Sequence, residues 1–194
     1  MIIKTIINDT KAYWNQYKDV KDIQKTPEEE PLRTCNVTSV AMIVNENPND
    51  VLWYFINKYG YEIGVRSPHF QWQELLVRYI QVAGYEVKNN LITPQAYPDA
   101  RNIKLEELKR MREEIDNGNI ILYHKCGHYQ VLVGYEIHID GNIDYVFNDP
   151  AGDRRLPYKK RKRESGHLVR YLETMIISEP IYGLCYTIVY NGKG

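Results

Sequence analysis

NIILYHKCGHYQVLVGYEIHIDGNIDYVFN, residues 119–148, contains three runs that are rich in Ile, Val, Tyr and Phe. The runs cover residues 119–123, 129–139 and 143–148. Such residues favour strands, and the Asp-Gly-Asn segment between the last two runs is typical of a hairpin turn. The pattern therefore predicts neighbouring strands of an antiparallel sheet.

On the N-terminal side of this sheet, apolar residues recur three and four positions apart, which is the spacing of helices packed on a core. The spacing predicts helices over residues 35–45, 49–59, 72–83 and 105–115. Helices followed by an antiparallel sheet, with no repeating βαβ pattern, predict an α+β fold.

The C-terminal part completes the expected domain. Residues 149–166 are polar and punctuated by proline, which predicts a long loop. A short helix over residues 168–175 and a final strand over residues 184–190 follow. A chain of 194 residues is long enough for one core and too short for two, so we expect residues 1–194 to form a single domain.

The composition is that of an ordinary globular protein, with 43% hydrophobic residues, 26% charged residues and a formal net charge of zero. This neutrality argues against nucleic acid as the main ligand, although residues 159–163, KKRKR, form a basic run that predicts a solvated loop or face. Cys35, Cys126 and Cys185 cannot form a closed set of disulfides, which favours a reducing compartment.

The N-terminus predicts no secretory signal, because its short apolar stretch is broken by Lys4 and lacks a cleavage-site pattern. No segment approaches the roughly 20 apolar residues that a membrane span requires. We therefore expect a chain that is made in the cytosol without a membrane span and that needs another route of release to act outside.

Cys35 lies where a proline-bounded acidic loop, residues 26–31, gives way to the first predicted helix. Amide groups and the dipole at a helix N-terminus stabilise a thiolate, so this position favours a reactive cysteine. Thr34 or Asn36 would cap the helix. Taken alone, however, a free cysteine is more often a small buried residue.

A thiol nucleophile needs a base, and His128 directly precedes a predicted strand that would hold its imidazole in place. Asp149 follows the next strand and precedes Pro150, which keeps the aspartate extended. An antiparallel hairpin brings these two ends together, so Asp149 would orient His128. A two-residue turn would pair Asp149 with Leu132, about 13 Å along the strand from His128, so a bulge, a longer turn or sheet twist must close the gap.

The segments around these residues are TCNVTSVAM at 34–42, GHYQVLVGY at 127–135 and NDPAGD at 148–153. In order and spacing they resemble the C39-like peptidase family of the papain-like clan. WNQYKD at 14–19 resembles the glutamine-containing segment that precedes the family's cysteine, and SGHLVRY at 165–171 resembles the segment that follows its aspartate. The resemblance thus extends over most of the chain.

This resemblance implies a papain-like α+β fold, with an N-terminal helical part packed on an antiparallel sheet. It also implies a cysteine-dependent peptidase or amidase with a catalytic triad of Cys35, His128 and Asp149 and no metal or organic cofactor. In such enzymes a glutamine side chain and the amide of the nucleophile stabilise the oxyanion. Gln16 takes that role by its matching flanks, and Gln24 is a second candidate.

Other interpretations stay open. His124, Cys126 and His128 alternate and would bind zinc if they projected from one strand face, although no fourth ligand is evident. Cys126 would form a disulfide on oxidation if it lay close to Cys35. The same fold could serve as an inactive binding module. The acyl-enzyme could also pass to an amine, which would make the protein a transferase or deamidase.

The expected substrate is a peptide. Relatives in this family include leader-peptide peptidases, which are usually fused to a transporter, and enzymes that lyse bacterial walls. The chain lacks a membrane segment, and its basic run at 159–163 would attract an anionic wall polymer. Together with a composition typical of a low-GC bacterium or its phage, these features favour peptidoglycan peptides over a processed leader peptide.

Overall fold

The computed structural model describes residues 1–20, 34–61, 69–91, 100–125, 127–157, 160–178 and 185–190. In chain order the elements are β1 (Ile2–Ile7), α1 (Cys35–Val44), α2 (Pro48–Tyr59), α3 (His69–Val82), β2 (Glu86–Leu91), α4 (Ala100–Asp116), β3 (Ile120–Lys125), β4 (His128–His138), β5 (Ile143–Asn148), the 3-10 helix η3 (Arg163–Gly166), β6 (Val169–Leu172), α5 (Glu173–Ser178) and β7 (Cys185–Tyr190).

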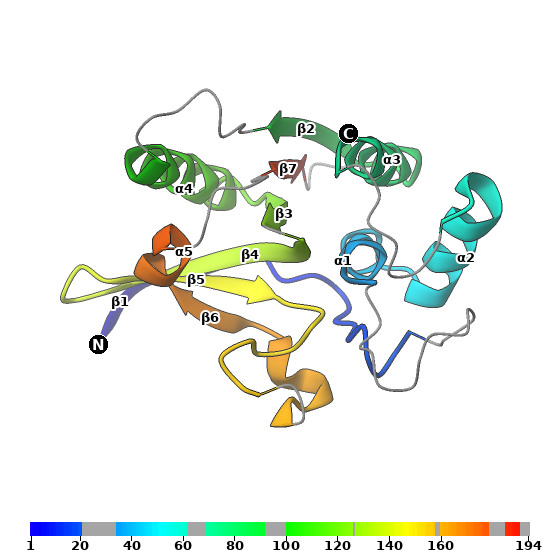
Figure 1. Cartoon of the computed structure of the whole chain (residues 1–194). Coiled ribbons are helices and arrows are strands. Elements are labelled where there is room, and N and C mark those ends of the chain that lie inside the picture. The colour runs from blue at the N-terminus through cyan, green and yellow to red at the C-terminus, as the bar shows by residue number, and fades with distance from the viewer. Residues whose placement is uncertain are drawn as a thin grey trace.

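A seven-stranded antiparallel sheet forms the centre of the molecule (Figure 1). Its strand order is β2-β7-β3-β4-β5-β6, and β1 pairs with β4 in addition. β4 is 11 residues long, so its first half pairs with β3 and its second half with β1, while β5 lies along its other edge. β4 therefore pairs with three strands, β1, β3 and β5, and is the central strand of the sheet.

The sheet separates two apolar cores. Val131 and Leu132 are consecutive on β4 and so point to opposite faces. Val131 packs with the helical core of α1, α2 and α3, whose buried residues include Val37, Met42, Phe55 and Leu76. Leu132 packs in the second core, beneath α4 and α5, with Leu108, Met111, Phe147 and Ile176. The first three predicted helices, α1, α2 and α3, thus cover one face of the sheet, and α4 and α5 cover the other.

The expected α+β fold, with helices packed on an antiparallel sheet, is confirmed, and the four predicted helices and the strands within residues 119–148 are present. The helix predicted over residues 168–175 is wrong in its first half. Residues 169–172 alternate between buried and exposed, which is the period of a strand, and they pair with β5 as β6. α5 begins only at Glu173. The strands β1 and β2 were not predicted either.

The β4–β5 hairpin combines a long turn with a bulge. Residues 139–142 form the turn, and Ile137 pairs with Ile143 beyond it. Between Leu132 and Gly134 the register shifts by one residue, so that Leu132 pairs with Phe147. Gly134 at this bulge has no room for a side chain, because a Cβ there would collide with the Ile6 carbonyl of β1. The hairpin therefore differs from the two-residue turn considered from the sequence.

Candidate active site

Cys35 is the first residue of α1. The first hydrogen bond of this helix runs from the Thr38 amide to the Thr34 carbonyl, at 2.9 Å, so the amides of the first turn point out of the helix end. Thr34 occupies the cap position, but its side chain makes no capping bond. All residues from Val37 to Val44 are buried, which fixes the helix in the core while Cys35 itself stays partly exposed.

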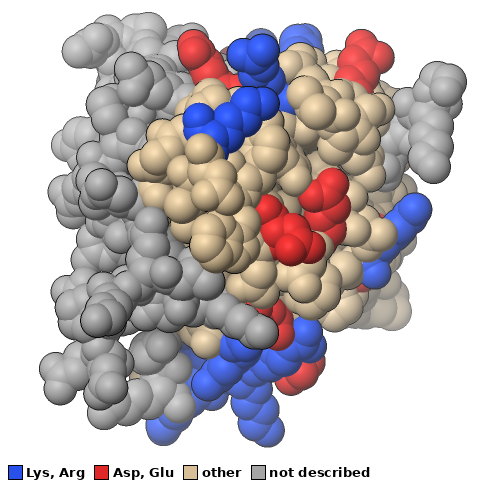
Figure 2. All heavy atoms as spheres, turned by 90° about the vertical axis from the view of Figure 1, so that its right-hand side faces the viewer, with Lys and Arg blue, Asp and Glu red and all other residues tan. Residues whose placement is uncertain are grey.

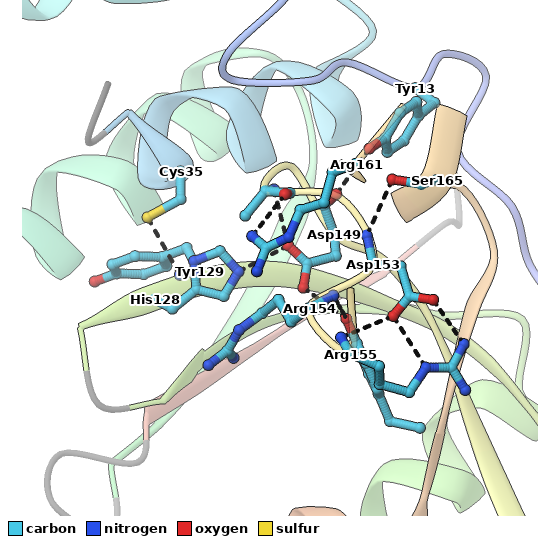
Figure 3. Close-up of polar contacts among 12 residues, drawn as sticks. Tyr13, Cys35, His128, Tyr129, Asp149, Asp153, Arg154, Arg155, Arg161 and Ser165 are labelled. Atoms are coloured by element: carbon cyan, nitrogen blue, oxygen red, sulfur yellow. Dashed lines mark hydrogen bonds and ion pairs between the residues drawn. The ribbon is translucent and has the colours of Figure 1, made fainter. Parts of the chain in front are cut away.

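His128 is the first residue of β4 and faces both Cys35 and Asp149 (Figure 3). Its Nε2 lies 2.8 Å from Oδ1 of Asp149. This contact leaves Nδ1 for the Cys35 side, where the charge of the imidazole acts on the thiol. The Tyr129 amide also donates to Sγ of Cys35, at 3.5 Å. The structure thus brings together the three residues that the sequence predicts as the triad.

The longer turn and the bulge together explain how His128 reaches Asp149. With the longer turn alone, Asp149 would pair with Val131. Because neighbouring residues of a strand point to opposite faces, Asp149 would then lie on the face away from His128. The bulge adds a second one-residue shift. Extending the register past Val131 and Asn148 places Asp149 opposite Gln130, on the same face as His128 and two residues from it. Of the three explanations considered from the sequence, the bulge and the longer turn therefore apply together.

Asp149 is fully buried and held on all sides. The Ala151 amide donates to Oδ1 at 2.9 Å, and the Tyr171 hydroxyl donates to Oδ2 at 3.1 Å. The backbone is fixed as well, because the Tyr13 hydroxyl donates to the Asp149 carbonyl, at 2.8 Å, and the Asp149 amide donates to Gly166. Neither tyrosine was predicted, because nothing local to residue 13 or 171 indicates a contact with residue 149.

The pKa values in this group favour a thiolate and an imidazolium. Burial would raise the pKa of the Cys35 thiol, but the hydrogen bond and charge of His128, with the Tyr129 amide, hold it below its ordinary value. Burial would lower the pKa of His128, but the charge and hydrogen bond of Asp149 raise it to about 9. Burial would raise the pKa of Asp149, but His128 and the Ala151 amide hold it below its ordinary value.

Gln16 is buried beside this site. Its backbone amide donates to the carbonyl of Pro150, the residue after Asp149, at 2.9 Å. The turn that contains Gln16 is fixed by Asp19, whose carboxylate accepts from the Asn15 amide at 2.7 Å. The structure therefore places the Gln16 segment next to the aspartate. Gln24, the second candidate for the oxyanion hole, lies outside the described residues.

The zinc alternative required three ligands on one strand face. His124 instead belongs to β3 and His128 to β4, so the two histidines lie on neighbouring strands. The His124 ring stacks on Tyr129, with ring centroids 4.1 Å apart, and His128 is bonded to Asp149. Cys126 lies outside the described residues, and so does its proposed disulfide with Cys35. Lys159, the first residue of the basic run, also lies outside them.

A protein-family model described as "Peptidase_C39 like family" matches residues 10–175. The chain belongs to this family. Family membership supports a function of the cysteine-peptidase type. No curated protein sequence matches the chain.

Among solved structures, a crystal structure of UfSP from C. elegans is similar to the chain, with a TM-score of 0.49 and 12% sequence identity. The match covers 96% of this chain and 34% of the UfSP chain, so the C39-like chain spans about a third of that protein's length.

In the part of the C39-like chain that the structure describes, every helix is too short or too polar to cross a bilayer.

Proposed function

We propose that this C39-like protein is a cysteine-dependent peptide hydrolase in which Cys35, His128 and Asp149 form the catalytic triad. The observation that carries the proposal is the geometry of one histidine. His128 binds a fully buried carboxylate through Nε2, at 2.8 Å, and faces the partly exposed Cys35 on its other side (Figure 3). A thiol at a helix N-terminus beside an imidazolium has the environment of a nucleophile.

In the proposed mechanism, the proton of the Cys35 thiol resides on His128, and the thiolate attacks the carbonyl carbon of an amide. The imidazolium of His128 then donates this proton to the leaving amine as the C–N bond breaks. Water, deprotonated by the neutral imidazole, attacks the thioester and releases the acid. Asp149 holds the imidazole in one orientation throughout and stabilises its charged form. These steps require neither a metal ion nor an organic cofactor.

The oxyanion of the tetrahedral intermediate would be stabilised by the Cys35 amide and by the side chain of Gln16. The amide is available because it precedes the first intrahelical hydrogen bond. Gln16 is suited to this role because its backbone is tied to Pro150, beside the triad.

As substrate we propose peptides of bacterial peptidoglycan. Support comes from the basic residues between Arg154 and Arg163, which follow Asp149 directly in the chain. Figure 2 shows lysines and arginines gathered along the lower part of the molecule, at the level of η3 in Figure 1. A positive surface beside the triad raises the local concentration of an anionic polymer.

The test is alkylation by iodoacetamide at neutral pH, followed by mass spectrometry, together with digestion of purified peptidoglycan. We expect Cys35 to be modified at least about tenfold faster than Cys126 and Cys185, since a thiolate is the reactive form. Wild-type protein should release new amino termini from peptidoglycan peptides, and Cys35→Ala should release none.

The two readouts separate the parts of the proposal. If Cys35 reacts no faster than the other two cysteines, the hydrolase is excluded and an inactive binding module takes its place. If Cys35 reacts rapidly but peptidoglycan stays intact, the activated thiol stands and the substrate is wrong.

A further inference from the structure

The basic residues that follow Asp149 differ in what they contact. Arg155 binds Asp153 through two nitrogens, each at 2.9 Å. Arg163 binds Asp19 at 2.8 Å. Arg161 donates to the carbonyls of Ala151 and Leu156 and so closes the loop on itself. These three arginines therefore have partners within the chain and serve the conformation of the loop.

Arg154 differs from these neighbours. Its side chain is exposed, and no carboxylate of the described residues forms an ion pair with it. Asp149 lies within range of its charge, since that charge helps to hold the pKa of Asp149 down. Both oxygens of Asp149 are already engaged, however, by His128 and Ala151 on one side and by Tyr171 on the other. Within the described parts of the chain, the donors of the guanidinium are therefore left for a group outside it.

The backbone of Arg154 is fixed beside the triad. Its amide donates to the Tyr171 hydroxyl at 3.2 Å, and this hydroxyl donates to Asp149. From this anchor the side chain extends toward the His128 end of the triad, away from Asp153 and Arg155 (Figure 3). An exposed positive charge is thus held at a defined place next to the residues that would bind the scissile amide.

We propose that Arg154 is a specificity-determining residue that binds a carboxylate of the substrate next to the scissile bond. A guanidinium is suited to this because its planar donors match both oxygens of a carboxylate. The inference rests on the proposed function and deepens it, because it selects peptides with an acidic side chain or a free carboxyl group near the cleaved amide. Peptides without such a group are poorer substrates.

Two alkylating reagents test this without a known substrate. Iodoacetate carries a carboxylate and iodoacetamide does not, and both react with the Cys35 thiolate. The ratio of their rates at Cys35 therefore reports the attraction of a carboxylate, and changes in the thiolate fraction cancel. At low ionic strength, where screening is weak, we expect Arg154→Ala to lower this ratio about two- to fourfold and Arg154→Glu to lower it further.

Matched variants give the controls. Arg154→Lys keeps the charge and should retain most of the ratio, and Lys109→Ala removes one exposed positive charge on α4 and should leave the ratio unchanged. An unchanged ratio in Arg154→Ala, with Cys35 still reacting faster than the other cysteines, overturns the role of Arg154 and leaves the hydrolase intact. Loss of selective reaction at Cys35 in the wild type overturns both.

Discussion

The β4–β5 hairpin carries a histidine–aspartate pair near each end, and the two pairs have almost the same geometry. His128 Nε2 lies 2.8 Å from Asp149, and His138 Nε2 lies 2.9 Å from Asp144. Their surroundings differ. The side chains of His128 and Asp149 are 14% and 0% exposed, whereas those of His138 and Asp144 are 26% and 15% exposed.

Their neighbours differ as well. His128 lies against Cys35, at the end of a buried helix. His138 and Asp144 lie close to Glu136, and these three groups are near enough to share a metal ion, but Glu136 is already neutralised by two bonds from Arg170, at 2.7 and 2.8 Å. A hairpin therefore supplies histidine–aspartate pairs readily, and reactivity requires burial and a nucleophile from another part of the chain.

Replacing the two histidines gives the largest expected contrast. His128→Ala removes the hydrogen bond and charge that stabilise the Cys35 thiolate and the acid that protonates the leaving amine. We expect peptide hydrolysis to fall by about 10²- to 10⁴-fold. His138→Ala should stay within about twofold of the wild type, because surface changes away from the site have small effects. Equal losses in both variants, measured as initial rates, would show that the hairpin as a whole is required.

The two aspartates should differ in their effect on the pH profile. In the wild type, hydrolysis should rise as the Cys35 thiol ionises, below its ordinary pKa, and should fall as His128 loses its proton at about pH 9. Asp149→Asn removes the charge that raises the pKa of His128, so the alkaline fall should move down by about 1 to 3 pH units.

Asp144→Asn is the matched control and should leave the alkaline fall at about pH 9. Initial rates between pH 5 and about pH 10 give both limbs of the profile. An alkaline limb that does not move in Asp149→Asn contradicts the role of Asp149.

The tyrosine that supports Asp149 has a smaller expected effect. Tyr171→Phe removes the donor to Oδ2 of a fully buried carboxylate, which should lower the free energy of unfolding by about 1–3 kcal/mol. Urea denaturation measures this. Tyr145→Phe is the control, because it removes a hydroxyl from Arg112 and Glu173, which remain paired with each other at 3.0 Å. Its loss should be smaller, and it should leave the reactivity of Cys35 unchanged.

The less buried pair, His138 and Asp144, should contribute least to stability. Asp144→Asn removes an ion pair near the turn, and such pairs contribute about 0.2–1 kcal/mol. Its urea midpoint should stay close to that of the wild type at pH 6. A loss as large as that of Tyr171→Phe would show that the Glu136 cluster stabilises the hairpin more than its exposure indicates.

Much of the candidate site could be predicted because its residues occupy places that local patterns mark. Cys35 precedes a run of helical apolar spacing, His128 directly follows Gly127 at the start of a β-branched run, and Asp149 precedes a proline. The α+β fold was predictable for the same reason, since helices and strands differ in the period of their apolar residues. The strand β6 was missed because four residues are too few to establish a period of two.

The sequence by itself therefore determined that Cys35 begins a helix, that His128 begins a strand and that Asp149 follows the next strand. The tertiary structure alone decided that they meet. A strand reverses its faces with each residue, so the side on which Asp149 lies depends on one bulge beside Gly134, where β1 passes too close for a side chain. The contacts of Tyr13 and Tyr171 with Asp149 join residues 136 and 22 positions apart, and no local pattern encodes such a pairing.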